Sequence, residues 1–269
     1  MNTTIYFFTG TGNSLKIARS ISDNLEDCEL VPIAKVWQED NLTATSEKVG
    51  FIFPLYYSGL PKIVFDFLNK IDLSKTGYFF AVVVSAGGTT EFPFQQLERI
   101  LNTKAKKLHL GYIIVMPTNY IIAYKTTPKD RQSLLFEKAS RQVEVISEMI
   151  KNEENNLDPD ILKREFLIYD GKYQIEKFNA NFREKVNKRD ESFYVEDTCN
   201  NCGVCKEICP VSNILLVEGG PRWQHKCQLC LACINYCPEK AIQFGSESKK
   251  TQRYHHPEIT IQDLKTQKK

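Results

Sequence analysis

The sequence has almost no net charge and no long hydrophobic run. Its 35 Lys and Arg residues stand against 33 Asp and Glu residues, which leaves a net charge of +2. A chain without a strong positive field is not expected to bind nucleic acid or an anionic membrane surface. The longest apolar runs, at residues 79–84 and 112–116, are far shorter than the roughly 20 residues of a membrane-spanning helix. The composition therefore predicts a globular protein that binds neither nucleic acid nor a membrane.

Several signals of location and catalysis are also missing. The chain does not begin with a basic, apolar leader and a cleavage site, so we expect a cytoplasmic protein. The turn after its first predicted strand is neither the G-x-G-x-x-G of a dinucleotide site nor the G-K-[ST] of a P-loop. No catalytic triad or pair of carboxylates stands out. The sequence therefore names no substrate.

The cysteines of the sequence form a repeated motif. Eight of the nine cysteines lie within residues 199–237, in two copies of C-x2-C-x2-C-x3-C, each followed by proline. Three cysteines at this spacing can surround one iron–sulfur cubane, while the fourth reaches across to the neighbouring cluster. We therefore assign cluster one to Cys199, Cys202, Cys205 and Cys237, and cluster two to Cys227, Cys230, Cys233 and Cys209.

Two structural zinc sites are the alternative for these cysteines. Zinc usually takes cysteines in separated C-x2-C pairs, whereas this pattern adds a third cysteine and a C-P step. Residues 199–244 instead resemble the bacterial two-cluster [4Fe–4S] ferredoxins. Polar residues such as Asn200 and Asn201 lie in the first copy, and Leu229 and Leu231 lie in the second. Because a polar shell tolerates the charge added on reduction better, we expect cluster two to have the lower potential.

The first 150 residues alternate between two patterns. Short apolar runs rich in Val, Ile, Phe and Tyr occur at residues 3–8, 29–33, 49–53, 78–84 and 112–116. Such runs fit strands that are buried on both faces of a parallel sheet. Helical patterns lie between and after them, at residues 13–25, 61–69, 92–102 and 127–150, the last with Thr127 as its expected N-cap. This alternation predicts an α/β doubly wound sheet.

Three loops of this sheet contain glycine. The first, Thr-Gly-Thr-Gly-Asn-Ser at residues 9–14, joins a strand to a helix. Glycines and small hydroxyl residues at such a turn let backbone N–H groups surround a phosphate, although a tight turn that binds nothing is the alternative. The other two, at residues 54–61 and 85–90, follow strands at the same carboxyl edge, where open α/β folds bind ligands.

Three such loops on one edge resemble the phosphate loop and the two flavin-ring loops of flavodoxin. With the cysteine block downstream, the chain resembles the EFR1 family, in which a flavodoxin-like domain is fused to a two-cluster ferredoxin. The resemblance implies a flavodoxin-like doubly wound parallel five-stranded sheet of order 2-1-3-4-5 and a small α+β ferredoxin domain. It implies an FMN-binding domain at residues 1–150, a helical linker at 151–190, the ferredoxin domain at 191–247 and a tail at 248–269. We expect this tail to dock back on the protein.

The resemblance also implies which residues bind FMN. The hydroxyls and backbone N–H groups of residues 9–14 would hold the phosphate, and Tyr56 or Tyr57 would stack on the ring. Core packing is the alternative for one tyrosine, since neighbours on a strand end point opposite ways. Gly59 stands where a flavodoxin backbone can turn toward the flavin. The full set is Thr9, Gly10, Thr11, Gly12, Asn13 and Ser14; Pro54, Leu55, Tyr56, Tyr57, Ser58 and Gly59; Ser85, Ala86, Gly87, Gly88 and Thr89; and Asn119 and Tyr120, which would close the site.

These features together predict an electron-transfer flavoprotein in which FMN exchanges electrons with two [4Fe–4S] clusters of the same chain. Its partners would be redox partner proteins or small-molecule electron carriers. Two alternatives stay open: an FMN-dependent reductase of a small molecule fed by the clusters, and a redox sensor that passes no current. The near-neutral charge departs from the acidic flavodoxins. A ferredoxin domain on the same chain would remove the need for electrostatic steering.

Overall fold

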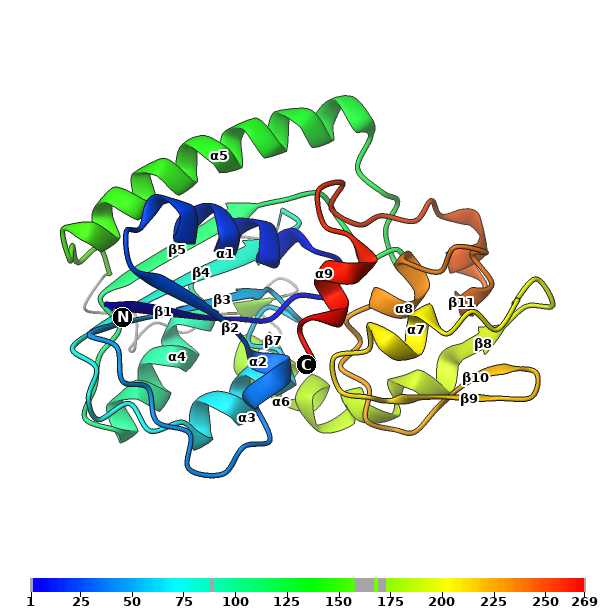
Figure 1. Ribbon diagram of the computed structural model, residues 1–269, viewed down its shortest axis with the longest axis horizontal. Coiled ribbons are helices and arrows are strands. Elements are labelled where there is room, and N and C mark those ends of the chain that lie inside the picture. The colour runs from blue at the N-terminus through cyan, green and yellow to red at the C-terminus, as the bar shows by residue number, and fades with distance from the viewer. Residues whose placement is uncertain (1, 88–89, 158–166, 169–172, 269) are drawn as a thin grey trace.

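A five-stranded parallel sheet of order β2-β1-β3-β4-β5 forms the centre of the molecule (Figure 1). The computed structural model describes residues 2–87, 90–157, 167–168 and 173–268. The strands are β1 Thr3–Phe7, β2 Cys28–Pro32, β3 Lys48–Pro54, β4 Tyr78–Ser85 and β5 Leu110–Val115. Every residue of β1 and β4 is buried, as the continuous apolar runs predicted. The predicted sheet and its strand order are confirmed.

Helices cover both faces of this sheet (Figure 1). Their bounds are α1 Asn13–Asn24, α2 Ile33–Val36, α3 Lys62–Lys70, α4 Phe92–Thr103 and α5 Lys129–Lys151. Alternate residues of β1 enter different cores: Ile5 packs in the core that includes α1 and α5, and Tyr6 in the core that includes α3 and α4. The helical patterns of the sequence therefore form the two outer layers of a doubly wound fold.

The start of α5 differs from the prediction by one residue. Pro128 is the N-cap, and the helix begins at Lys129. The Thr127 hydroxyl, which was expected to cap the helix, instead accepts a hydrogen bond from Thr118 N at 3.0 Å. Thr127 thereby fixes the segment that follows β5 at the carboxyl edge of the sheet.

The cysteine-rich part lies beyond the carboxyl ends of the strands (Figure 1). Its elements are β8 Phe193–Val195, α7 Val204–Glu207, β9 Ile214–Val217, β10 Gly220–Trp223, α8 Ala232–Asn235, β11 Ile242–Phe244, η2 Glu247–Lys250 and α9 Ile261–Lys265. β9 and β10 form an antiparallel hairpin, and β8 pairs with β11. In the described part of the chain, every helix is too short or too polar to cross a bilayer.

A short connecting segment joins the two parts. It contains the antiparallel pair β6 Leu167–Ile168 and β7 Tyr173–Gln174, the helix α6 Ile175–Lys185 and the 3-10 helix η1 Val186–Ser192. The residues predicted as a helical linker thus include a strand pair as well as helix. Phe182 of α6 is buried in the same core as the α3 and α4 residues, so this helix is packed against the body of the protein.

Both cores of the sheet continue into the cysteine-rich part. The core on the α3 and α4 side includes Phe193, Ile214 and Leu231, and the core on the α1 and α5 side includes Tyr236 and Ile259. Burial of apolar surface is the main favourable term in folding. The position of one part on the other is therefore set by shared packing and not by the connecting segment alone.

Candidate functional site

The loop of residues 9–14 leaves hydrogen-bond donors free for an anion. Thr9 Oγ1 accepts from Gly12 N at 3.1 Å, and Thr11 Oγ1 accepts from Asn119 Nδ2 at 2.7 Å. A hydroxyl that accepts a hydrogen bond still has its own hydrogen to donate. Gly12, with a φ of 98°, is the N-cap of α1, and the first turn of this helix carries no acidic residue. Free hydroxyl donors beside a helix N-terminus fit a phosphate group.

The Asn13 side chain anchors this loop. Its Nδ2 donates to Pro117 O at 3.0 Å, and its Oδ1 accepts from the Tyr254 hydroxyl at 2.7 Å. Both ends of the amide are therefore used within the protein. Toward a phosphate, Asn13 would contribute its backbone N–H.

The loop after β3 forms a tight turn. Tyr56 N donates to Gly59 O and Gly59 N donates to Tyr56 O, both at 3.0 Å. Tyr57 and Ser58 occupy the tip, with φ values of 48° and 62°. Gly59 does not line the cavity described below, and its expected role toward the flavin stays a prediction. An added Cβ would lie 2.5 Å from Gln96 Oε1, so Gly59 is required by packing against α4.

Aromatic rings from three elements meet beside this turn. The rings of Tyr57 and Phe182 are stacked, with centroids 4.0 Å apart and an interplanar angle of 10°. The Tyr57 and Tyr120 hydroxyls lie 2.8 Å apart, within hydrogen-bond distance. One face of the Tyr57 ring is thus covered by α6. Phe182 and its neighbour Phe178 were not predicted as site residues, although their spacing of four residues in a helical segment puts both on one face.

These loops surround a cavity of about 490 Å³ at the carboxyl edge of the sheet, which we call the edge cavity. Its volume is within the usual range of roughly 300–1,000 Å³ for small-molecule sites. Predicted residues that line it are Thr9, Gly10, Thr11, Asn13, Ser14, Pro54, Leu55, Tyr56, Tyr57, Ser58, Ser85, Ala86, Asn119 and Tyr120. Lining residues that the sequence did not suggest are Val84, Pro117, Thr118, Ala123, Tyr124, Phe178, Phe182 and Leu229.

Three predicted glycines do not line the edge cavity. Besides Gly59, these are Gly12, whose added Cβ would lie 2.7 Å from Ile259 Cβ, and the exposed Gly87, with a φ of 127°. Gly12 is thus covered by the tail. The backbone N–H of Gly87 donates to the Ser85 hydroxyl at 3.2 Å. The predictions for Gly88 and Thr89 fall outside the described residues.

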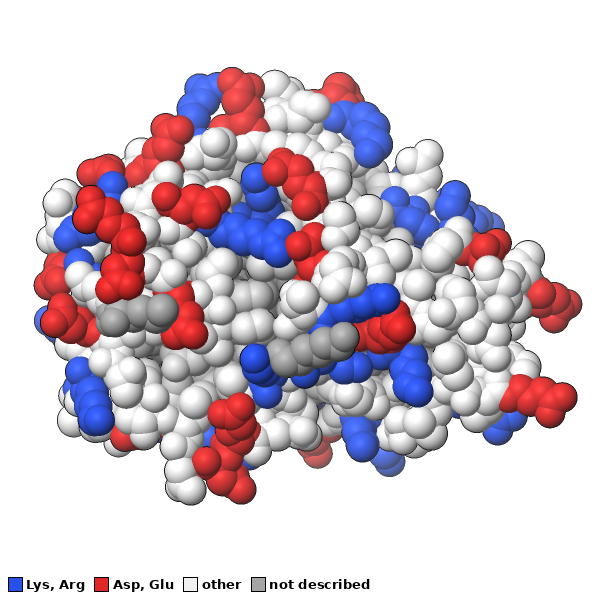
Figure 2. Space-filling view, viewed as in Figure 1, with Lys and Arg blue, Asp and Glu red and all other residues white. Residues whose placement is uncertain are grey.

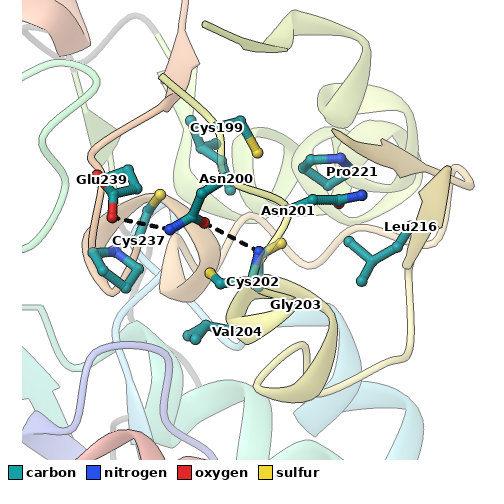
Figure 3. A pocket seen from close by; sticks show the side chains of 13 residues that line it. Cys199, Asn200, Asn201, Cys202, Gly203, Val204, Leu216, Pro221, Cys237 and Glu239 are labelled. Carbon is teal, nitrogen blue, oxygen red and sulfur yellow. Dashed lines mark hydrogen bonds between the residues drawn. The ribbon is translucent and has the colours of Figure 1, made fainter. Parts of the chain in front are cut away.

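The first set of four cysteines lines one cavity (Figure 3), and we call it the cluster-one site: Cys199, Cys202, Cys205 and Cys237. Asn200 lies across its mouth. Its Oδ1 accepts from Cys202 N at 3.1 Å and its Nδ2 donates to Glu239 Oε1 at 3.1 Å, as Figure 3 shows. Cys202 is exposed to solvent, whereas Cys205 is buried and burial raises the pKa of its thiol to about 12. This site therefore lies at the surface.

The second set, the cluster-two site, lines a separate cavity: Cys209, Cys227, Cys230 and Cys233. Burial raises the pKa of the Cys227 and Cys233 thiols well above their ordinary value, and that of Cys230 to about 12. Backbone amides point at the sulfurs: Asn213 N donates to Cys209 Sγ and Leu229 N to Cys227 Sγ, both at 3.2 Å. Buried sulfurs that must ionise need a positive group between them, and iron would supply it.

The four cysteines of each set line one cavity. Among the described residues, no three His, Cys, Asp or Glu side chains come close enough together to hold a single metal ion. Zinc with ligands at about 2.3 Å would require four sulfurs gathered around one point. The spacing of the four cysteines in each set is the one that holds a cubane at its corners.

The edge cavity and the cluster-two site share a wall. Leu229 lines the edge cavity, while its neighbours Gln228 and Cys230 line the cluster-two site. A Cβ added to Gly10 would lie 2.2 Å from the Cys230 carbonyl oxygen, so the two loops touch backbone to backbone. Gln228 Oε1 also accepts a hydrogen bond from Ile63 N in the first turn of α3, at 3.0 Å.

The tail folds back over the loop of residues 9–14, as expected. His256 N donates to Thr11 O at 2.8 Å, and the His256 ring packs on Phe136 of α5 with centroids 4.8 Å apart. The His255 ring stacks instead on Tyr236, at 4.3 Å. The two histidine rings thus pack against different partners and do not form a metal site. The tail connects the loop of residues 9–14 to the cysteine-rich part.

Ion pairs hold the outer side of the tail to α1. Lys16 Nζ lies 2.6 Å from Glu258 Oε2, and an Arg19 nitrogen lies 2.6 Å from Asp263 Oδ1. On the face drawn in Figure 2, acidic and basic residues are interspersed over the sheet domain and no single-sign field is present. Long-range steering by charge is accordingly not a feature of this face.

Comparison with known proteins finds similarity to flavodoxins and to a polyferredoxin-like protein. Residues 4–113 match the flavodoxin domain family. Over 60 residues the chain is 37% identical to a polyferredoxin-like protein of Methanocaldococcus jannaschii, covering 22% of this chain and only 26% of that protein. Similar solved structures include two-electron reduced flavodoxin of Megasphaera elsdenii, at 17% identity and a TM-score of 0.34 over 52% of this chain and 98% of that one. The Trp repressor binding protein of Bacillus subtilis gives 16% identity and a TM-score of 0.31 over 52% and 94%.

The sheet order, the edge cavity and the doubled cysteine motif define a flavodoxin-like α/β protein with a second, cysteine-rich domain. The family match falls on the sheet, and the relative found by sequence is polyferredoxin-like. Residues 4–113 match a flavodoxin domain, and a further similarity is to a polyferredoxin-like protein, so the chain resembles the fusion of these two types that the EFR1 family has.

Proposed function

We propose that this chain is an electron-transfer flavoprotein that passes electrons between FMN and two [4Fe–4S] clusters. FMN would occupy the edge cavity, with its phosphate at the hydroxyls of Thr9 and Thr11 and its ring beside Tyr57. Flavin accepts two electrons and releases them singly, and this is the chemistry that it would supply. The cluster-one and cluster-two sites would each hold one cluster through four cysteines.

The shared wall carries the proposal. Leu229 faces the edge cavity, and the residues on either side of it line the cluster-two site. Gly10 of the phosphate loop packs on the Cys230 backbone without room for a side chain. An electron leaving the edge cavity would therefore need to pass one layer of side chains to reach cluster two. No solvent layer would separate the two groups, because these contacts are buried.

The two cysteine sites would act in sequence. The cluster-two site is buried against the flavodoxin domain, while the cluster-one site has an exposed cysteine at the surface. We propose that cluster one exchanges electrons with outside partners, either redox proteins or small-molecule carriers. The proposal places the protein in the cytoplasm, where thiols stay reduced and can bind iron.

Anaerobic purification followed by cofactor analysis and rapid mixing tests this function. We expect FMN together with about eight iron and eight sulfide per chain, the content of two cubanes. After mixing with a one-electron reductant, flavin should be reduced through the clusters at a rate that does not depend on protein concentration. A chain without flavin, or a rate that rises in proportion to protein concentration, would contradict transfer within one chain.

A further inference from the structure

A buried acidic side chain takes no part in the sites described so far. Asp190 belongs to η1, and only 2% of it is exposed. The His225 ring lies beside it, with Nδ1 2.8 Å from Asp190 Oδ1, and among the described residues no lysine or arginine forms an ion pair with this carboxylate. Burial of a carboxylate without a cationic partner is costly unless hydrogen bonds offset the cost. The hydrogen bonds that Asp190 accepts therefore indicate what it does.

Asp190 holds together two segments that carry ligands of cluster two. Its Oδ2 accepts a hydrogen bond from Asn213 Nδ2 at 2.8 Å and a second one from His225 N at 2.9 Å. Asn213 lies four residues after Cys209, and His225 lies two residues before Cys227. One carboxylate of the connecting segment thus fixes these two ligand-bearing segments relative to each other.

Asn213 extends this contact to a ligand sulfur. Its backbone N–H donates to Cys209 Sγ at 3.2 Å. Its side-chain Oδ1 accepts from Gln224 N at 3.2 Å and from Lys226 N at 2.6 Å, which holds the residues just before the second copy of the cysteine motif. Asn213 and Cys209 both line the cluster-two site. A single residue, with a hydrogen bond at each end, therefore separates the Asp190 carboxylate from a ligand sulfur.

The two copies of the cysteine motif differ at this position. The residue four places after Cys209 is Asn213, whereas the residue four places after Cys237 is Ala241, which has no polar side chain. The acidic residue in the lining of the cluster-one site is Glu239, and it is exposed, so solvent screens its charge. The arrangement around Asn213 is therefore not repeated four residues after Cys237.

We propose that Asp190 positions the ligands of cluster two and that its negative charge lowers the reduction potential of this cluster. The inference rests on the proposed function and adds a positioning residue to it. Reduction adds an electron to the cluster, and a negative charge in a poorly screened interior opposes that addition. The carboxylate would act in the same direction as the apolar loop and would keep cluster two below cluster one in potential.

Redox titration of the anaerobic holoprotein at pH 8, where histidine side chains are ordinarily neutral, tests the charge. Electron paramagnetic resonance follows each cluster. Asp190→Asn removes the charge and can keep the three hydrogen bonds, because its amide oxygen can accept both donors of Oδ2 while its amide nitrogen donates to the other tautomer of the His225 ring. We expect this variant to raise the potential of cluster two by about 59 mV, a tenfold change in equilibrium constant for a one-electron couple.

The matched control is Glu191→Gln, which removes the charge of the next residue in the chain. Glu191 is exposed, so solvent screens its charge and neither cluster potential should move. Cluster one should also keep its potential in Asp190→Asn. A shift of the same size in Glu191→Gln would assign the effect to the net charge of the segment and would overturn the inference.

Asp190→Ala tests the positioning. It leaves the buried Asn213 amide and His225 N without their acceptor, so the two ligand-bearing segments lose the group that joins them. We expect the purified variant to hold about four iron and four sulfide per chain, the content of one cubane, with the resonance of cluster one retained. A variant with the iron content of the wild type would overturn the positioning role. If Asp190→Ala does not fold, the potential of cluster two in Asp190→Asn decides the inference.

The outcomes separate this inference from the function on which it rests. If both cofactors are bound and exchange electrons but Asp190→Asn leaves the potential of cluster two unchanged, the inference is wrong and the proposed function stands. A wild-type chain that holds no flavin or no cluster would overturn the proposed function and this inference together.

Discussion

The two cysteine sites have the same spacing and opposite surroundings. At the cluster-one site Cys202 is exposed and Asn200 spans the mouth, whereas at the cluster-two site three of the four cysteines are buried and the loop packs on the flavodoxin domain. The spacing of the cysteines determines which of them bind one cluster, and this spacing is the same in the two copies. The surroundings of the ligands differ, and this difference is the basis of the proposal that cluster one serves outside partners and cluster two the flavin.

The difference extends to the rest of the protein. The loop of cluster two forms part of the edge cavity through Leu229 and meets the first turn of α3 through Gln228. The lining of the cluster-one site, by contrast, comes entirely from residues 199–242. Damage to cluster two should therefore reach the flavin, and damage to cluster one should stay local.

Loss of one ligand should have the largest effect and the clearest asymmetry. Cys233→Ala removes a buried ligand of cluster two, and Cys202→Ala an exposed ligand of cluster one. We expect Cys233→Ala to abolish reduction of the flavin through the clusters and to weaken FMN binding by about tenfold, a typical coupling between adjacent sites. Cys202→Ala should change FMN affinity by less than about twofold. Fluorescence titration with FMN and assays of iron and sulfide measure both.

Iron content is the control in this pair, since each variant should lose one cluster only. Equal FMN affinities in two variants that each lack one cluster would contradict the asymmetry. If Cys202→Ala instead released the flavin, the surface site would be coupled to the edge cavity by contacts that the shared wall does not explain.

A methyl group added between the loop of residues 9–14 and the cluster-two site should cause the next largest effect, a loss of stability. In Gly10→Ala the new Cβ would meet the Cys230 carbonyl oxygen at 2.2 Å, and neither backbone can move without disturbing its own site. We expect a loss of about 3 kcal/mol in the free energy of unfolding. Gly77→Ala is the matched control, because the nearest atom to its added Cβ is 4.0 Å away. Denaturant unfolding should show the control within about 0.5 kcal/mol of the wild type; equal losses would mean that the two loops do not touch.

Acid should loosen the tail on the side of the phosphate loop. Burial lowers the pKa of His256 to about 4, from an ordinary value of 6.5. The folded protein thus disfavours the charged ring, so this contribution to stability is complete above about pH 6.5 and is lost as the pH falls toward about 4. At about pH 5 we expect a loss of about 2 kcal/mol in the free energy of unfolding relative to neutral pH.

His256→Gln removes this titration and should flatten the pH dependence of unfolding between about pH 7 and about pH 5. His255→Gln is the control, since His255 is the exposed neighbour and its ring packs on Tyr236. A pH profile that is unchanged in His256→Gln would show that other groups cause the acid sensitivity. FMN affinity should show the same pH dependence, because the backbone N–H of His256 donates a hydrogen bond to Thr11 O.

The elements of the fold were predictable because their signals are local. The continuous apolar runs are long enough to identify buried strands, and the cysteine spacing alone assigned four residues to each of two cavities, in which the structure places them. The place of the loop of residues 9–14, between β1 and α1 at the edge cavity, was predictable for the same reason. Each of these signals is contained in about ten residues or fewer of sequence.

Contacts between distant segments had no such signal. Phe182 reaches the Tyr57 ring from a helix more than a hundred residues away, and Tyr254 binds Asn13 across nearly the whole chain. Gly59 resembles a flavin-loop glycine in sequence, and the structure adds that Gln96 of α4 and Asn179 of α6 leave no room for a side chain there. Which partner each tyrosine ring meets depends on such packing, and no local pattern encodes it.

The smallest expected effect bears most directly on the two clusters. The polar mouth of the cluster-one site includes Asn200, which binds Cys202 N and Glu239. If polarity is what separates the two potentials, cluster two should titrate below cluster one. Asn200→Ala should then lower the potential of cluster one by less than about 59 mV, a tenfold change in equilibrium constant, and should leave cluster two in place. Redox titration with electron paramagnetic resonance resolves the two. A wild-type protein with cluster two as the higher-potential centre would show that the hydrogen bonds to its buried sulfurs, from Asn213 N and Leu229 N, outweigh the apolar loop around them.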